Sequence, residues 1–347
     1  MNRMAEPRFA IADLLRRAGI DAQVKDVVPG AYGGNNRIYK VETSAGDFAA
    51  KFYFRHAEDS RDRLAAEYAF LTYAVTVAPG LTPRPVACSA EHGMALYEFV
   101  QGRRLGQEEI GVREVDSAID FFQALNAKLP ASTFNLPVAS EACFSISDHL
   151  ALIGGRIDRL VAVNPLSAID VEGADFVRQI DRLWQQLSAR IIVDARRRDL
   201  DIDVPLPPER RCISPSDFGF HNALVADDGR IRFLDFEYAG WDDPAKAAGD
   251  FFAQLAVPVP EEFFGRFSAG IAQGRPDARQ ITDRATLLRR AYKIKWCCIA
   301  LNVFLPVHLA RRRFADPDLD EAAVKTTQLE RARQLLNSIY KMNDGLH

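Results

Sequence analysis

Three polar side chains stand where predicted strands begin or end, and their types suit metal binding and proton transfer. Asp217 and Asn222 lie in "CISPSDFGFHNALV", a polar interruption just before an apolar strand, and Asp235 follows the next strand. Carboxylate and carboxamide oxygens are ligands that Mg²⁺ prefers, and a carboxylate on a tight loop can accept a proton from a hydroxyl group. Asp217 is therefore a candidate base, and Asn222 and Asp235 are candidate metal ligands. The alternative is that these are ordinary turn and strand-end residues.

Two apolar runs around an Asp-Gly dipeptide at 228–229 predict a hairpin that would bring these groups together. Asp-Gly is typical of a two-residue type I′ turn, which needs positive φ at both central positions. Such a loop pairs Asn222 with Asp235 and Leu224 with Phe233, and both polar side chains then lie on one face. A shift of one residue in the register would separate them.

A glycine-rich turn between two predicted strands is a candidate phosphate-binding loop. "VVPGAYGGNNRIYKV" contains Gly30, Gly33 and Gly34, where a backbone without Cβ atoms can approach a polyphosphate. An ordinary hairpin with glycines at positive φ is the alternative. No GK[ST] sequence occurs, so the turn is not a Walker A loop.

Lys51 lies in the apolar strand "FAAKFYF", where burial of an ammonium group is costly unless an anion pairs with it. Glu67, in the mostly apolar run "LAAEYAFL", is the expected partner. Such a pair can hold a lysine against nucleotide phosphates. Two surface charges with extended side chains are the alternative.

The elements that must position these residues fall into a sheet-rich part and a larger helical part. Residues 1–100 are predicted to form a nucleotide-binding lobe with an opening helix, an antiparallel five-stranded sheet and one inner helix. Residues 101–347 are predicted to form a helical lobe, with the segment around Asp217 as its catalytic loop and with the substrate site. Its clearest helical patterns cover 175–198, 261–272, 283–304 and 318–341.

Composition excludes several classes of protein. With 347 residues, 48% of them hydrophobic and 26% charged, the chain is typical of a globular protein. A net charge of -3 argues against a nucleic-acid binder. Five cysteines without CxxC spacing, and no recognisable signal peptide, favour the cytoplasm. The apolar run 297–310 is too short to span a membrane and predicts a core helix, so no membrane insertion is expected. The oligomeric state stays open.

The order of these features resembles the protein-kinase-like superfamily: a glycine loop, a strand lysine, a helix glutamate, D-x-x-x-x-N and then Asp-Phe-x. Within it, the chain looks like the aminoglycoside phosphotransferase and choline kinase branch over about residues 24–252. The resemblance implies an α+β, bilobal protein-kinase-like fold. It also implies an enzyme that uses ATP and Mg²⁺ to phosphorylate a hydroxyl group of a small molecule, such as an aminoglycoside, a sugar, a choline-like compound or an amino alcohol.

The resemblance also assigns roles to residues. Asp217 would be the catalytic base, Asn222 and Asp235 the Mg²⁺ ligands, Lys51 the contact with the α- and β-phosphates, and Glu67 its partner. "LYEFVQG" resembles the hinge between lobes, so backbone groups of Glu98 and Val100 would contact the adenine. The segment "GWDDPAKAAGDF" matches a family G-x-x-D-P pattern. Candidates on the substrate side are Glu237, Tyr238, Trp241 and Asp243, the last with a structural role as its alternative.

One departure from the family pattern is Pro215-Ser216, which replaces the usual His-Gly before the aspartate. The residues expected to contact Mg·ATP remain, so an active enzyme is predicted. The departure motivates an alternative, a catalytically weak nucleotide-binding pseudokinase or scaffold. A protein kinase is disfavoured because no A-P-E-like segment follows Asp235. His221, on the face opposite Asn222, is predicted to serve packing.

The acceptor cannot be chosen from the sequence. Asp242, Asp243 and Asp250, with Tyr238 and Trp241, would suit a cationic amine through charge and cation–π contacts. The arginine pairs at 210–211 and 289–290 would instead favour an anionic acceptor, or are simply surface charges.

Overall fold

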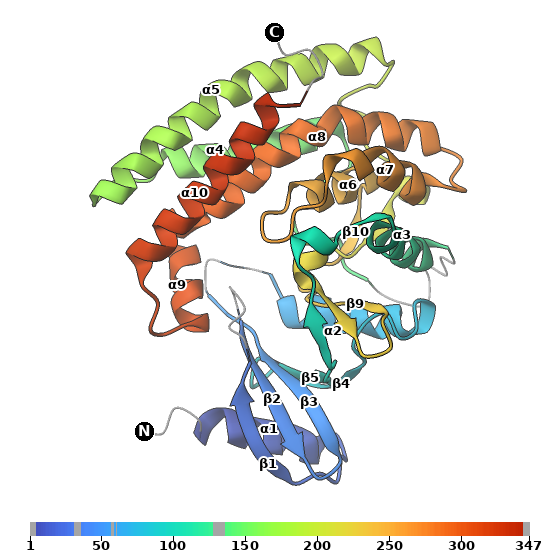
Figure 1. The fold of residues 1–347 in the computed structure, drawn as a ribbon, viewed down its shortest axis with the longest axis vertical. Coiled ribbons are helices and arrows are strands. Elements are labelled where there is room, and N and C mark those ends of the chain that lie inside the picture. Colours follow the sequence, from blue (N-terminus) through green and yellow to red (C-terminus); the bar gives the residue numbers. More distant parts are fainter. Residues whose placement is uncertain (1–4, 31–35, 57–58, 60, 128–135, 343–347) are drawn as a thin grey trace.

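The computed structural model describes residues 5–30, 36–56, 59, 61–127 and 136–342. A small antiparallel sheet with one outer helix forms one end of the molecule, and helices form most of the other end (Figure 1). This arrangement confirms the predicted α+β class, with a small antiparallel sheet in the N-terminal part and helices in the C-terminal part. The boundary proposed at residue 100 stays a prediction.

Five antiparallel strands make up the N-terminal sheet, in the order β1-β2-β3-β5-β4. Its elements are β1 (Val24–Pro29), β2 (Arg37–Thr43), β3 (Gly46–Phe52), β4 (Pro85–Ser89) and β5 (Met94–Glu98). One face packs against α1 (Ala5–Arg17) through Ile11 and Leu14, which join Val41 and Leu96 in a separate apolar cluster. The predicted meander and its two additional strands are confirmed.

Helix α2 (Arg63–Val77) connects the sheet to the rest of the molecule. It begins at Asp62, whose side chain accepts a hydrogen bond from the backbone N–H of Ala65 at 3.0 Å, as an N-cap residue does. Phe70 and Leu71 of α2 are buried in the main core, which extends into the helical part. Glu67 is one of the buried residues of α2, so its carboxylate has a fixed position between the N-terminal sheet and the helical part.

Short strands frame the predicted catalytic segment. β6 (Gly102–Arg104), β8 (Ala223–Ala226) and β9 (Ile231–Phe233) form one small sheet, and β7 (Cys212–Ser214) pairs with β10 (Gly240–Asp242) in another. These pairings place the segment between β7 and β8 beside the end of β9.

The predicted register of the β8–β9 hairpin is wrong by one residue. Ala223, not Leu224, pairs with Phe233, and the backbone oxygen of Asn222 accepts a hydrogen bond from Leu234 at 2.8 Å. The loop has three residues and ends with Gly229 at φ 76°, as in hairpins with a turn followed by a left-handed residue. Asn222 therefore does not pair with Asp235 across the ladder.

Eight α-helices build the described C-terminal part, and short 3₁₀ turns connect several of them. The helices are α3 (Val112–Asn126), α4 (Ile146–Val161), α5 (Ala168–Arg197), α6 (Pro244–Ala253), α7 (Phe264–Ala272), α8 (Ala278–Leu301), α9 (Pro306–Ala315) and α10 (Glu321–Tyr340). The 3₁₀ turns are Gln107–Glu109, Pro208–Arg210, Phe220–Asn222, Glu261–Phe263 and Asn302–Phe304. α5, α8 and α10 lie side by side at the end far from the sheet (Figure 1).

Helix α8 is the centre of this part, and α6 packs directly against it. A Cβ atom at Gly249 of α6 would lie 2.4 Å from the ring of Tyr292 on α8, so only glycine allows this approach. The apolar run 297–310 is not one helix as predicted, because α8 and α9 are bent by 75° at the intervening turn. Within the described residues, no single helix has the length and apolarity to cross a membrane, and this bent pair meets those criteria only jointly.

Candidate active site

The predicted ion pair between Lys51 and Glu67 is present. Lys51 Nζ lies 2.6 Å from Glu67 Oε2, and both side chains are buried. Glu67 also accepts hydrogen bonds from the Tyr53 hydroxyl at 2.7 Å and the backbone N–H of Phe236 at 3.1 Å. Burial alone would lower the pKa of Lys51, but the charges of Asp235, Glu67 and Glu237 outweigh it and raise that pKa well above its usual value. Lys51 is thus a permanent cation.

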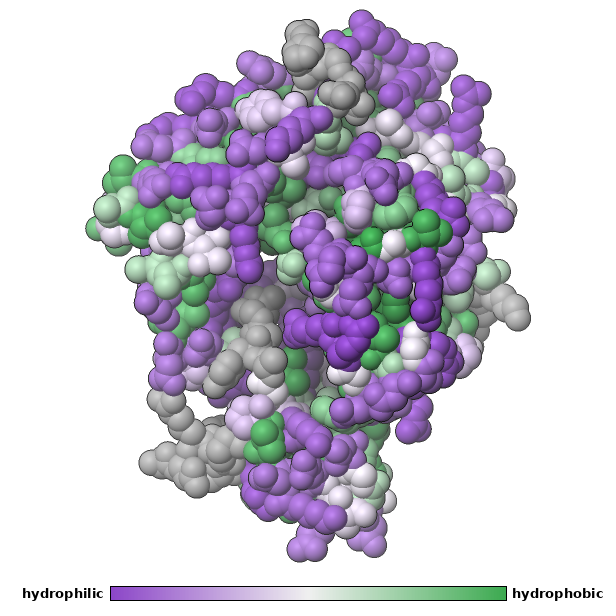
Figure 2. All heavy atoms as spheres, viewed as in Figure 1, coloured by the Kyte–Doolittle hydropathy of each residue, from purple (hydrophilic) through white to green (hydrophobic). Residues whose placement is uncertain are grey.

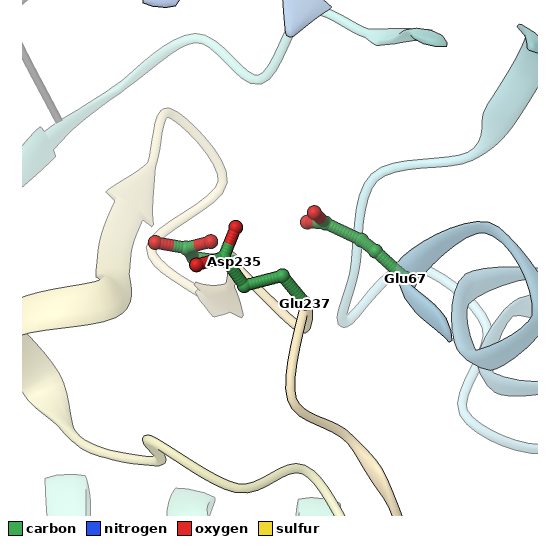
Figure 3. A group of neighbouring side chains, drawn as sticks. All are labelled: Glu67, Asp235 and Glu237. Carbon is green, nitrogen blue, oxygen red and sulfur yellow. The ribbon is translucent and has the colours of Figure 1, made fainter. Parts of the chain in front are cut away.

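Lys51 also joins the N-terminal sheet to the segment after β9. Its Nζ lies 2.5 Å from Asp235 Oδ1 and 3.7 Å from Glu237 Oε2. Carboxylate oxygens of Glu67, Asp235 and Glu237 lie within 4.8 Å of one another, and Figure 3 shows the three groups converging. The Asp235 side chain is 38% exposed, whereas the other two are buried. Of the three, Asp235 is therefore the carboxylate that a ligand can reach.

Unusual backbone geometry marks the same place. Ser216, Asp217 and Asp235 have φ values of 44°, 39° and 65°, in the left-handed region that residues with a Cβ rarely adopt. Such conformations cost roughly 1–3 kcal/mol each and persist only where the surroundings impose them. The two loops that carry the predicted base and one predicted metal ligand are thus held in specific conformations.

Asp217 is held by residues of its own loop. Its carboxylate oxygen Oδ1 lies 3.3 Å from His221 Nε2, and its backbone oxygen accepts a hydrogen bond from Asn222 Nδ2 at 3.1 Å. The side chain is 30% exposed. The base candidate is therefore oriented but still accessible.

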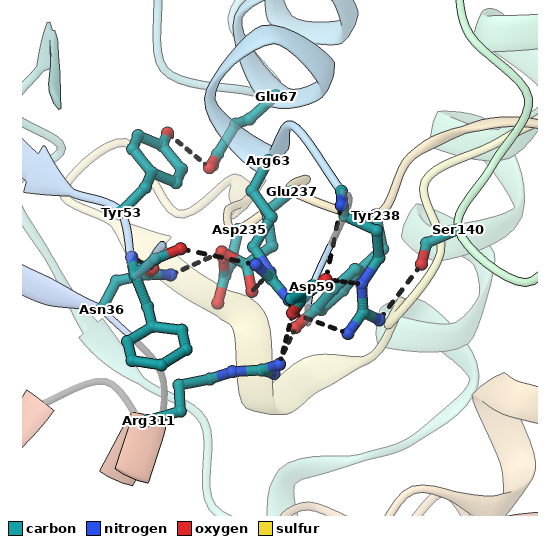
Figure 4. A network of polar contacts seen from close by, with 12 residues as sticks. Asn36, Tyr53, Asp59, Arg63, Glu67, Ser140, Asp235, Glu237, Tyr238 and Arg311 are labelled. Atoms are coloured by element: carbon teal, nitrogen blue, oxygen red, sulfur yellow. Dashed lines mark hydrogen bonds and ion pairs between the residues drawn. The ribbon is translucent and has the colours of Figure 1, made fainter. Parts of the chain in front are cut away.

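Glu237 and Tyr238 belong to a polar network between the two parts of the molecule (Figure 4). Glu237 accepts a hydrogen bond from Asn36 Nδ2 at 2.5 Å, and the Tyr238 hydroxyl lies 3.4 Å from Arg311. Burial, followed by the charge of Glu237, raises the pKa of the Tyr238 phenol above its usual value. Glu237 is 3% exposed, so it supports the site from behind.

The glycine loop and hinge are described only in part. Gly33 and Gly34 lie outside the described residues. Gly30 follows β1 and donates a backbone hydrogen bond to Ile38 at 2.7 Å. Glu98 ends β5, and its backbone N–H already donates to Arg84 at 2.9 Å, while Val100 is buried. Contacts of Glu98 and Val100 with a nucleotide base stay a prediction.

A pocket opens beside Asp217 on the helical side. The residues that line it are Arg61, Ser140, Glu141, Arg156, Ser216, Asp217, Tyr238, Lys246, Asp250, Lys295, Trp296, Ile299, Asn302, His308, Arg311 and Arg312. Of the four candidates on the substrate side, Tyr238 lines this pocket, and so does Asp250, which was considered for a cationic acceptor. Trp241 pairs with Ile213 in the small β7–β10 sheet. Asp243 is fully buried and contacts His149 and Arg284.

Several charged residues of this pocket were not singled out as site residues from the sequence. Lys246 and Lys295 are both buried, and Lys295 Nζ lies 2.8 Å from Asp250 Oδ1. Trp296 Nε1 donates to the same oxygen at 2.8 Å. Both lysines stand in apolar runs, "PAKAAGDFF" and "AYKIKWCCIAL", which is the signal that identified Lys51. Arg156 and Arg311 have no comparable signal because arginines are frequent throughout the chain.

Comparisons with known proteins identify a family for this chain. The "Phosphotransferase enzyme family" matches residues 26–281. No match was found among curated proteins.

Solved structures share the fold over almost the whole chain. The GDP complex of an aminoglycoside 2′-phosphotransferase-IIIa mutant has a TM-score of 0.59 at 14% identity and covers 97% of this chain and 99% of its own. A choline kinase from Cryptosporidium parvum Iowa II has a TM-score of 0.53 at 11% identity, and the match covers 91% of this chain and 90% of the choline kinase. A Plasmodium vivax ethanolamine kinase has a TM-score of 0.53 at 15% identity, and the match covers 94% of this chain and 86% of the ethanolamine kinase. The family match covers more than half of the chain, which therefore belongs to the phosphotransferase enzyme family.

Proposed function

We propose that this protein transfers the γ-phosphoryl group of ATP to a hydroxyl group of a small molecule. The observation that carries the proposal is the single charge cluster in which Lys51 joins Glu67 and Asp235, next to a pocket that exposes Asp217. The structural relatives include an aminoglycoside phosphotransferase with ADP and another with streptomycin and ATP. These complexes support a nucleotide as the phosphoryl donor.

The nucleotide would lie against the N-terminal sheet. Lys51 is a buried cation that Glu67 holds in place, so it is suited to contact the α- and β-phosphates. Gly30, with Gly33 and Gly34, would approach the phosphates, and backbone groups of Glu98 and Val100 would contact the base. The buried position of Lys51 means that little reorganisation is needed when the phosphates bind.

The residues near Asp235 fit a magnesium ion. Asp235 uses Oδ1 for Lys51, and among the described residues its second oxygen has no hydrogen-bond partner. Asn222 donates through Nδ2, which leaves its carbonyl oxygen as the ligand atom. Oxygen ligands of this kind suit Mg²⁺, which would neutralise charge on the transferred phosphoryl group. Glu67 and Glu237 are committed to Lys51 and Asn36 and fit a supporting role.

In the proposed reaction, Asp217 orients the acceptor hydroxyl group and accepts its proton. The hydroxyl oxygen forms a bond to the γ-phosphorus, the bond from that phosphorus to the bridging oxygen breaks, and ADP leaves. Much of the rate acceleration comes from positioning and from neutralisation of charge, because the transition state is loose. Asp217 stands at the edge of the pocket where such an acceptor would lie.

The test is transfer of labelled γ-phosphate from Mg·ATP into pooled small-molecule alcohols. We expect Asp217→Ala to reduce transfer by about 10²-fold or more while Mg·ATP binding stays nearly unchanged, because general-base catalysis contributes about that much. Asp235→Ala is expected to remove the Mg²⁺-dependent part of ATP binding. Full transfer by Asp217→Ala would refute the base, and unchanged Mg·ATP affinity in Asp235→Ala would refute the metal ligand.

The main alternative is a nucleotide-binding pseudokinase or scaffold, which Pro215-Ser216 motivates. It predicts Mg·ATP binding without transfer to any pool. Two expectations for the whole chain also remain proposals. One is the division into a nucleotide-binding part, 1–100, and a substrate-binding part, 101–347. The other is a cytoplasmic location, which the five free cysteines favour.

A further inference from the structure

The pocket beside Asp217 contains more cations than carboxylates. Six of the residues that line it are arginines or lysines: Arg61, Arg156, Lys246, Lys295, Arg311 and Arg312. Only three are acidic: Glu141, Asp217 and Asp250. Asp217 is the candidate base, so only the carboxylates of Glu141 and Asp250 remain in the lining to neutralise the six cations.

Part of this positive charge is paired. Lys295 and Lys246 lie 2.8 Å and 3.7 Å from Asp250, and Lys246 also pairs with the buried Asp242 behind the pocket. Arg156 pairs with Glu141. These pairs account for three of the cations and for both remaining acidic residues of the lining.

Two of the other three cations, Arg61 and Arg311, share one carboxylate, Asp59. Arg61 Nε lies 2.7 Å from Asp59 Oδ1, and Arg311 Nη2 lies 2.9 Å from Asp59 Oδ2. Arg63, behind the pocket, pairs with the same carboxylate, and Figure 4 shows Asp59 between the labelled Arg63 and Arg311 side chains. No described residue forms a hydrogen bond or ion pair with the guanidinium of Arg312. One negative charge therefore faces several positive ones.

The arginines also have unused donors. The Nε atoms of Arg311 and Arg156 are buried and have no hydrogen-bond partner among the described residues. A buried donor without a partner is destabilising, so native proteins rarely leave one unused. Guanidinium groups match phosphate and carboxylate oxygens through parallel N–H donors. An anion in the pocket would balance the positive charge of these arginines.

The pKa values of two other residues that line the pocket, His308 and Arg312, are also lowered. Burial, followed by the charges of Arg311, Arg156 and Arg61, lowers the pKa of His308 to about 3. Burial, followed by the charges of Arg331 and Arg311, lowers the pKa of Arg312. His308 is therefore neutral at pH 7, because burial disfavours its charged form and the nearby arginines disfavour it further.

Apart from Asp217, the proposed base, each carboxylate that lines this pocket is paired with a lysine or an arginine of the protein. The sequence suggested Asp242 and Asp250 as contacts for an amine, but Asp242 pairs with Lys246 and Asp250 pairs with Lys295. The arginine pairs at 210–211 and 289–290 do not line the pocket, and Arg289 pairs with Glu261. The arginines that line the pocket are thus different from the pairs at 210–211 and 289–290 that the sequence suggested for an anionic acceptor.

We propose that the acceptor is a small molecule that carries an anionic group, a phosphate, sulfate or carboxylate, besides the hydroxyl group that becomes phosphorylated. This inference rests on the proposed function. The guanidinium groups of Arg311 and Arg312 bind the anionic group, and the hydroxyl group lies at Asp217. Binding at the opposite end from the reacting oxygen fixes which hydroxyl group is presented to the base.

The first experiment measures transfer of labelled γ-phosphate from Mg·ATP into four separate pools: sugar phosphates, sugar acids, neutral sugars, and aminoglycosides with amino alcohols. We expect label in the sugar phosphate or sugar acid pool, and the labelled pool identifies the anionic group. Label only in neutral sugars or amines overturns the anionic acceptor and leaves the phosphotransferase proposal standing. No label in any pool, from protein that binds Mg·ATP, overturns the phosphotransferase proposal itself.

The second experiment tests the anion site without turnover. Inorganic phosphate is titrated by calorimetry into the full chain at constant ionic strength, with the nucleotide site filled by a non-hydrolysable ATP analogue. Arg312→Met removes one pocket cation, and Arg313→Met removes an exposed neighbour on the same helix that pairs with Glu321. We expect Arg312→Met to weaken phosphate binding at least tenfold and Arg313→Met to leave it unchanged. Absent binding, or equal effects of the two changes, overturns the anion site.

Discussion

His221 contacts Asp217, the proposed base, in a chain that departs from the family pattern just before that aspartate. The usual histidine two residues before the aspartate is Pro215 here. His221, four residues after Asp217, places Nε2 3.3 Å from the carboxylate and packs edge-on against Trp296, with ring centroids 6.2 Å apart. The predicted packing is present, and the contact with the proposed base is additional. We therefore propose that His221 is a positioning residue, which would act through Asp217.

Replacement of His221 tests this role. We expect His221→Phe, which keeps a flat ring but loses the nitrogen, to lower kcat roughly tenfold and leave KM for ATP nearly unchanged, since misplaced catalytic groups lose rate before they lose substrate binding. His221→Gln can still donate a hydrogen bond and should recover part of kcat. Steady-state kinetics with the labelled acceptor measure both. Equal losses in the two variants, or no loss in either, would contradict positioning through the hydrogen bond.

Individual site residues could be predicted where burial made a charge conspicuous. A lone ammonium in an apolar strand requires an anion, which led from Lys51 to Glu67. His221 was assigned to the wrong face because alternation with period two applies only to strands, and Phe220–Asn222 is a 3₁₀ turn. Arg311 could not be predicted, since nothing local in the sequence places α9 near Asp59.

At the level of elements, the start of α6 is a charge cluster that determines where the pocket residues Lys246 and Asp250 lie. Asp243 is the N-cap residue, and its Oδ1 accepts a hydrogen bond from Ala245 N at 2.8 Å. Its Oδ2 contacts Arg284 and His149. Burial opposes the charge, but Arg284 and His149 outweigh it and lower the pKa of Asp243 below its usual value.

We therefore expect Asp243→Asn to lower the free energy of unfolding by about 3 kcal/mol, because the change leaves a buried guanidinium without its counter-charge. Urea unfolding measures the loss. Asp283→Asn removes a carboxylate that lies at the surface 3.7 Å from Arg198, and should cost less than about 1 kcal/mol. A raised KM for the acceptor with unchanged stability in Asp243→Asn would instead place this residue on the substrate side.

Most elements could be predicted because their periodicity is strong. The five strands of the sheet and the long helices α5 and α10 follow directly from apolar spacing and turn residues. The hairpin loop could not be fixed, because an Asp-Gly dipeptide suits both two-residue and three-residue loops. The break between α8 and α9 was missed because a core helix and a sharply bent pair have the same apolar composition.

At the scale of the whole molecule, polar contacts join the sheet-rich and helical parts across long stretches of sequence. Lys51 contacts Asp235, Asn36 contacts Glu237, and Asp59 contacts Arg311, which is 252 residues away in the sequence. The sequence predicts neither such pairings nor the pocket beside Asp217, since they depend on how the two parts pack. The rest of the surface in Figure 2 is largely hydrophilic, with hydrophobic residues in scattered groups.

Many of the buried ion pairs make stability depend on pH with the same sign. Nearby arginines or lysines lower the pKa of Asp59, Glu141 and Asp250 below their usual values, although burial opposes the shift. A carboxyl group with a lowered pKa stabilises the folded state above the pKa of the unfolded chain, and this contribution is lost as the pH falls through the folded pKa. Asp242 has a raised pKa and opposes this trend.

Glu141 gives the most direct test. Its pKa is lowered from 4.5 to about 2; burial acts against this, and the charges of Arg156, Lys295 and Lys246 outweigh it. The carboxylate should therefore contribute about 3 kcal/mol to the free energy of unfolding above pH 5, and lose it between about pH 4.5 and pH 2. Urea unfolding of the wild-type chain and Glu141→Gln at pH 7, 5, 4 and 3 measures this difference. Glu91→Gln, which removes an exposed partner of Arg17, should show a small difference at every pH. A Glu141→Gln difference that is the same at pH 5 and pH 3 would show that the ion pair does not depress this pKa, and that the pocket is less positive than its arginines indicate.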